Sequence, residues 1–291
     1  MPVYDRRYRP WTGDRAGARS PIATVARHAL ARVTSSRLAL VLFVLACVPP
    51  LGFAAFIYVM NNLEMLAAMG IRIGSDTVDT STFFVFLVVQ SAVGFLLAAL
   101  VGPSLIAPDL AHGAMPLYLS RPIGRLEYAL GKLAVLAGML SIVTWIPGLL
   151  LVGLQGALAD GWLAAHLRVA VAVLVGSWIW IALISLVALA ISAWVRWRPL
   201  ATAMLFIVFL VGEAFGRAVN AILGTRWGQL VILDDLVETV WIALFGEMSG
   251  LGEMVATEPL PLGVALVALA AATALASWML LARIRAVEVS R

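Results

Sequence analysis

Six long runs of hydrophobic residues, separated by shorter polar segments, dominate this chain of 291 residues. The hydrocarbon core of a bilayer is about 30 Å thick, so a helix needs roughly 20 apolar residues to cross it. The six runs meet that length and lie at 38–60, 82–106, 129–154, 168–194, 200–221 and 261–283. The pattern predicts an all-α polytopic membrane protein with six transmembrane helices, whose single membrane domain covers residues 38–283.

Two amphipathic segments lie outside these runs. Residues 21–37 carry apolar side chains at 22, 25, 26, 29, 30 and 33, the spacing of one helical face. A basic helix of this kind lies in the membrane interface. Within the segment 222–260, the stretch QLVILDDLVETVWIALFG has apolar residues at helical spacing, with Asp234, Asp235 and Glu238 opposite. It predicts a short helix that either lies on the outer face or dips in and back, and that either caps a cavity or serves packing.

The distribution of charge predicts the orientation. The composition, 63% hydrophobic and 12% charged, is that of a membrane protein. With a cytoplasmic N-terminus, 16 of the 20 basic residues fall on the cytoplasmic side, as the positive-inside rule requires. We therefore expect residues 1–37 to form a cytoplasmic leader with an interfacial helix, and 284–291 to form a cytoplasmic tail. The excess of basic residues reflects this orientation and an attraction to anionic lipid headgroups. It does not predict a nucleic-acid partner.

Three polar residues within the runs are candidates for a transport pathway or gate. Gln90 is an amide in an apolar run, where it either holds helices together or contacts a substrate. Glu213 and Arg217 are four residues apart, so an ion pair on one helical face is available to them. Because a charge is costly inside a bilayer, both should face protein or water, as a structural pair or as part of a pathway.

Catalytic and cofactor motifs are missing from the sequence. The single cysteine, Cys47, excludes an intrachain disulfide, and the three histidines have no metal-ligand spacing. The segment from Gly124 to Lys132 resembles a phosphate-binding loop only superficially, because its spacing is wrong and Leu133 replaces the required hydroxyl residue. We predict that the chain is not itself an enzyme, binds no metal or cofactor, and uses Lys132 as an interfacial anchor.

The polar insert between the second and third runs, APDLAHGAMPLYLSRPIGRLEYALGK at 107–132, has the composition of a shaped docking loop. Proline and glycine punctuate it, and apolar and aromatic residues form a patch of the kind that anchors interfaces. With the leader YDRRYRPWTG at 4–13 and the six-run layout, this insert resembles the corresponding segment of ABC-2 type permeases of bacterial ABC transporters. The likeness in the insert lies in Asp109, Gly113, the stretch LYLSRPIGR at 117–125 and Gly131-Lys132. The resemblance implies an ATPase-coupling loop whose candidate residues are Asp109, Gly113, Leu117, Tyr118, Leu119, Arg121 and Pro122.

That resemblance implies a function. The chain would be the permease subunit of an ATP-driven exporter in the bacterial cytoplasmic (inner) membrane, pairing with a second, identical or different, permease half. Cytoplasmic ABC ATPase subunits, which would hold ATP and magnesium, would dock on the loop 108–122. The resemblance supplies no substrate-binding residue.

Two other functions fit the same sequence. An ion-gradient-driven secondary transporter would carry internal repeats and broken helices at mid-membrane, and no convincing repeat is visible. A non-transporting anchor or signalling subunit would share the whole layout. Association with an ATPase separates the permease from the first, and substrate flux separates it from the second.

Overall fold

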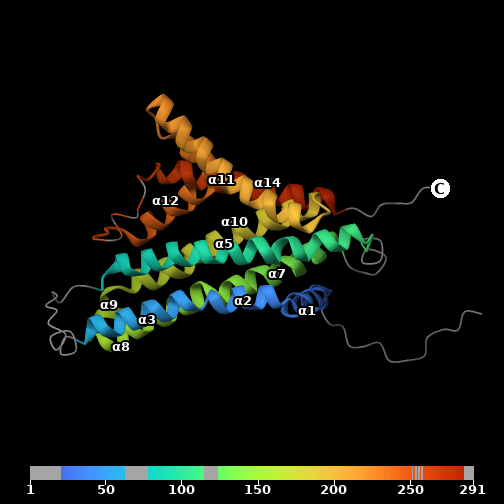
Figure 1. The fold of residues 1–291 in the computed structure, drawn as a ribbon. Helices are drawn as coiled ribbons and strands as arrows, with labels where there is room; N and C mark the ends of the chain where they lie inside the picture. Colours follow the sequence, from blue (N-terminus) through green and yellow to red (C-terminus); the bar gives the residue numbers. More distant parts are fainter. Residues whose placement is uncertain are drawn as a thin grey trace, which may run out of the picture.

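The computed structural model describes residues 21–62, 78–114, 124–250, 252, 254, 256 and 258–284, and every regular element in this part of the chain is helical (Figure 1). The elements are α1 (Pro21–Thr34), α2 (Arg37–Leu45), α3 (Val48–Asn61), α5 (Thr80–Ala111), α7 (Arg125–Val143), α8 (Trp145–Leu158), α9 (Trp162–Ala165), α10 (Leu167–Trp194), α11 (Arg198–Leu223), the 3-10 helix η1 (Trp227–Val231), α12 (Leu233–Phe245) and α14 (Leu262–Arg283).

Six helical segments are long and apolar enough to cross a membrane, which confirms the all-helical class and the expected number of spans. The spans are Arg37–Asn61, Thr80–Ala111, Arg125–Leu158, Leu167–Trp194, Arg198–Leu223 and Leu262–Arg283. The first consists of α2 followed by α3, and the third consists of α7 followed by α8. The chain is therefore a multi-pass membrane protein.

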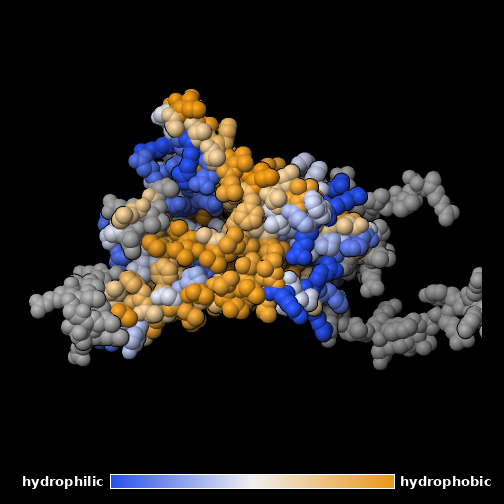
Figure 2. All heavy atoms as spheres, viewed as in Figure 1, coloured by the Kyte–Doolittle hydropathy of each residue, from blue (hydrophilic) through white to orange (hydrophobic). Residues whose placement is uncertain are grey.

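The bundle has two distinct ends, which we name the α1 end and the α9 end after the helices found there (Figure 1). The last residues of α5 and α14 and the first residues of α7 lie at the α1 end. Between the ends, the face drawn in Figure 2 is mainly hydrophobic, and hydrophilic residues gather around the α1 end. This banding is expected of a surface whose middle contacts lipid.

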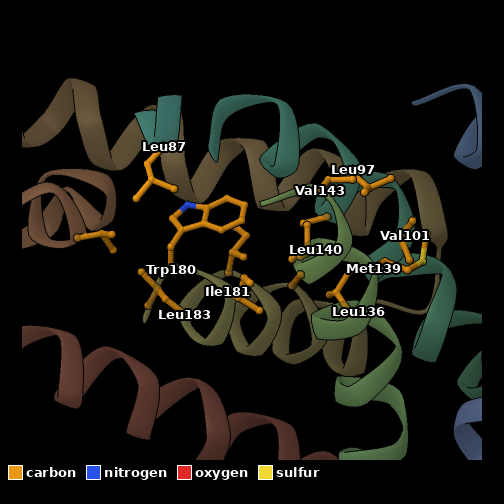
Figure 3. Packing of buried hydrophobic residues seen from close by; sticks show 14 of the residues in the cluster. Leu87, Leu97, Val101, Leu136, Met139, Leu140, Val143, Trp180, Ile181 and Leu183 are labelled. Atoms are coloured by element: carbon orange, nitrogen blue, oxygen red, sulfur yellow. The ribbon is translucent and has the colours of Figure 1, made fainter. Parts of the chain in front are cut away.

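Helix α10 is the centre of the bundle, in contact with α5, α7, α8, α11, α12 and α14. Small residues let neighbouring helices approach it closely. A Cβ atom on Gly94 of α5 would lie 2.7 Å from the Trp180 indole, and one on Gly102 would lie 2.7 Å from the Ala188 methyl carbon. Figure 3 shows the indole of Trp180 between Leu87 and the side chains of α7. Without a hydrophobic driving force inside lipid, such close packing holds transmembrane helices together.

The first span is interrupted near its middle, as its two adjacent prolines predict. Helix α2 ends at Leu45 and α3 begins at Val48. Pro50 has no N–H, so the carbonyl of Ala46, four residues earlier, loses its helical donor. Gln90 of α5 replaces that donor, because its side-chain Nε2 lies 2.9 Å from the Ala46 oxygen. Gln90 is completely buried, and its amide holds α5 to the break in the first span.

Replacing Gln90 with leucine should therefore lower the free energy of unfolding by about 1 kcal/mol, because the Ala46 carbonyl is left without a donor. The same substitution should cost almost nothing in a Pro50→Ala background, where residue 50 supplies the N–H itself. Unfolding in mixed detergent micelles measures both differences. An equal cost in the two backgrounds would show that Gln90 does not act through the broken helix.

Candidate functional site

Among the described residues, a network of four polar side chains, three of them buried, joins three helices at the α1 end. The carboxylate of Asp109, in the last turns of α5, accepts hydrogen bonds from Tyr128 Oη at 2.8 Å and Lys132 Nζ at 2.7 Å, both on α7. Its other oxygen accepts one from Arg32 Nη1 of α1 at 2.8 Å. The side chains of Asp109 and Lys132 are only 3% and 2% exposed. A buried carboxylate is tolerable only with such compensation.

The network revises two sequence-based interpretations. Asp109 is not a surface residue of a docking loop, because α5 continues to Ala111 and carries the carboxylate into the interior. Lys132 is not an anchor exposed at the membrane interface, because its ammonium group is buried against Asp109. Both residues instead fix the relative positions of α5 and α7, the helices on either side of the segment 115–123.

The remaining residues of the proposed docking loop divide into two groups. Gly113 lies two residues after the last residue of α5 and adopts a positive φ of 64°, a conformation that favours glycine. It therefore ends the helix. The other residues assigned to the loop, Leu117, Tyr118, Leu119, Arg121 and Pro122, lie outside the described part of the chain.

Helix α1 packs closely against α7 beside this network. Its buried residues Val25, Ala29 and Val33 recur at the spacing of one helical face. Gly131 of α7 permits the contact, since a Cβ atom there would lie 2.8 Å from the Val25 side chain. Part of the apolar face of the expected interfacial helix is thus buried against protein, whereas Leu30 on that face is exposed.

A second polar region borders a cavity of about 430 Å³ between α5, α10, α11 and α12. We call it the acidic cavity, because three carboxylate residues lie along its wall together with apolar and aromatic side chains. Its lining residues are Val88, Ser91, Ala92, Phe95, Trp180, Phe206, Phe209, Leu210, Glu213, Asp234, Val237, Glu238 and Trp241. In Figure 2, hydrophilic residues interrupt the hydrophobic surface where Figure 1 places α11 and α12.

Helix α12 supplies one wall of the cavity because it packs into the bundle. Trp241 donates a hydrogen bond from Nε1 to the Gly176 carbonyl of α10 at 2.9 Å. Arg168, at the start of α10, donates to the carbonyls of Ala243 and Leu244, each at 2.7 Å. These bonds satisfy carbonyls that the C-terminus of α12 leaves without helical donors. The expected amphipathic helix is present, and it both packs against α10 and lines the cavity.

The ion pair expected between Glu213 and Arg217 is present. Arg217 Nε lies 3.0 Å from Glu213 Oε1, and its Nη2 lies 3.8 Å from a carboxylate oxygen of Asp235. Asp234 is exposed along the cavity wall, but the protein packed around it partly desolvates its carboxylate. This desolvation, with the charges of Asp235, Glu213 and Glu238, raises the pKa of Asp234 to about 6. The cavity wall therefore strongly favours positive charge.

The three residues proposed for a pathway or gate thus have different surroundings. Glu213 lines the acidic cavity, and Arg217 is bonded to it. Gln90 does not line the cavity; it caps the broken first span. The sequence did not show that Asp234 and Glu238 line a cavity. The acidic face of their predicted helix was the one feature of the sequence that pointed to them.

Comparison with protein-family models gave no match, and no curated protein matches the chain significantly.

Proposed function

We propose that this chain is the membrane-spanning permease subunit of an ATP-driven exporter. Separate cytoplasmic ATPase subunits dock on the 108–122 region, and two permease halves together form the pathway. ATP and magnesium belong to the partner. The described residues contain no group of three or more histidine, cysteine, aspartate or glutamate side chains that could hold a metal.

The observation that carries the proposal is the buried network around Asp109. The segment 115–123 joins α5 to α7, and Asp109 and Lys132 clamp those two helices together just beside it. Arg32 adds the amphipathic helix α1 to the same unit. A force applied to the segment by a partner would therefore move α1, α5 and α7 as one body. Such rigid coupling is what an external motor needs, and an anchoring subunit would not need it.

The charge distribution supports a cytoplasmic α1 end. Among the described residues, eight basic residues lie at or near this end: Arg27, Arg32, Arg37, Arg125, Lys132, Arg196, Arg198 and Arg283. Three lie towards the other end: Arg168, Arg217 and Arg226. The positive-inside rule places the richer end in the cytoplasm. The docking region is then on the side where ATP is available.

Co-purification tests the proposal. The tagged chain, extracted from its native membrane in mild detergent, should elute with a soluble ATPase that mass spectrometry identifies by its phosphate-binding loop sequence. The double substitution Leu117→Asp with Arg121→Glu should abolish that association while the variant still elutes as a folded protein. The matched control is Leu163→Asp, which places the same charge on an exposed residue of α9 at the opposite end.

Three outcomes contradict the proposal in different ways. Absence of an ATPase under several gentle conditions favours a gradient-driven transporter. Loss of the ATPase from the Leu163→Asp variant as well shows that docking is not confined to the α1 end. Association without ATP-dependent substrate flux favours an anchoring or signalling subunit.

A further inference from the structure

The acidic cavity has the size and lining of a small-molecule site. Its volume of about 430 Å³ falls within the roughly 300–1,000 Å³ typical of ligand pockets. Such pockets have mainly apolar and aromatic walls with a few polar groups placed together, and they occur between the helices of bundles. Here all four helices supply apolar or aromatic residues, Glu213 comes from α11, and Asp234 and Glu238 come from α12.

The aromatic wall is an ordered cluster. The ring of Phe95 lies 5.2 Å from that of Phe206 in an edge-to-face arrangement and 4.9 Å from that of Phe209. Trp180 and Trp241 also line the cavity. Aromatic faces attract cations, and groups of them recognise quaternary ammonium ligands in other proteins. This wall suits an apolar body that carries a delocalised positive charge.

Negative charge predominates around the same space. Among the described residues that line it, three carry a carboxylate group: Glu213, Asp234 and Glu238. None of the described residues that line the cavity is basic. Carboxylate groups attract a cation, and the aromatic rings beside them add to that attraction.

We propose that the acidic cavity binds a hydrophobic organic cation, with its apolar body against Phe95, Phe206 and Phe209 and its charge facing Asp234 and Glu238. As a substrate class for the exporter this rests on the proposed function, but binding itself needs neither ATP nor a partner subunit.

Two probes of the same shape and opposite charge test the site: tetraphenylphosphonium and tetraphenylborate. Equilibrium dialysis against the purified chain in nanodiscs of neutral lipid, corrected with empty nanodiscs, gives the affinity of each. We expect saturable binding of the phosphonium at least about tenfold tighter than that of the borate. Equal binding of the two would overturn the proposal and indicate a cavity filled by lipid.

Variants locate the binding in this cavity. Asp234→Asn with Glu238→Gln should weaken phosphonium binding at least tenfold, whereas Asp160→Asn, outside the cavity, should leave it unchanged. Phe209→Leu should weaken it, and Phe215→Leu on the same helix, which does not line the cavity, should not. Unchanged affinity in a folded double variant, shown by its elution and thermal unfolding, would refute the site.

The two proposals can fail separately. Phosphonium binding without a co-purifying ATPase would retain the site and refute the ATP-driven exporter. An associated ATPase without charge-selective binding would retain the permease and refute the organic cation as its ligand class.

Discussion

Replacing Lys132 with methionine should lower the free energy of unfolding by about 3 kcal/mol, a large part of the stability of a typical domain. The substitution leaves the Asp109 carboxylate buried at 3% exposure without its closest cation. Arg32 remains, but its side chain is 47% exposed and therefore compensates a buried charge less well. Unfolding in mixed detergent micelles measures the loss.

Two further variants show whether the loss comes from an uncompensated charge. The double variant Asp109→Leu with Lys132→Met removes both charges and should be markedly more stable than Lys132→Met alone, because replacing a whole buried pair is often nearly neutral. Arg226→Met breaks an ion pair with Glu258 in which both side chains are exposed, and it should cost less than about 1 kcal/mol. Equal losses for Lys132→Met and Arg226→Met would refute the structural importance of the network.

Substituting Gly216 with alanine should separate α11 from the segment that leads into α12. A Cβ atom on Gly216 would collide with the backbone oxygen of Gly228 in η1 and lie 2.6 Å from the Ile232 side chain. The contact with Gly228 is a contact with backbone, so no rotation of a side chain can relieve it. The two segments must therefore move apart. We expect a loss of about 1–3 kcal/mol in unfolding free energy. Because α12 forms a wall of the acidic cavity, phosphonium binding should also fall.

The matched control is Gly138→Ala on α7. A Cβ atom at this position would meet nothing within 4 Å. Alanine is the better helix former by about 1 kcal/mol, so this variant should be as stable as the wild-type chain or more stable. If both variants behave alike, the contact between Gly216 and Gly228 does not position α12.

The fold class could be predicted because the bilayer itself imposes it. A span needs a long apolar run, and the six runs are visible in the sequence without any knowledge of tertiary contacts. The Glu213–Arg217 ion pair could be predicted equally well, since residues four apart on a helix are neighbours. The interruption of the first span followed from the chemistry of Pro49 and Pro50.

Contacts between distant segments could not be predicted in this way. Asp109 and Lys132 are 23 residues apart on different helices, and charged residues near the end of a span usually extend towards water. The acidic face of α12 was visible as an amphipathic pattern, but not its burial against α10 and α11. Gln90 was recognised as an amide that needs a partner, yet its partner, the Ala46 carbonyl, is 44 residues away.

Site-specific photocrosslinking tests the central claim most directly. A benzophenone amino acid at position 118, in the segment 115–123 that connects α5 to α7 along the chain, should crosslink in intact cells to a soluble ATPase with a phosphate-binding loop. The same group at Trp162 of α9, at the opposite end, should not. Adducts to that ATPase from position 118 alone would agree with an ATP-driven permease. Adducts only to lipid, or the same adducts from both positions, would contradict it.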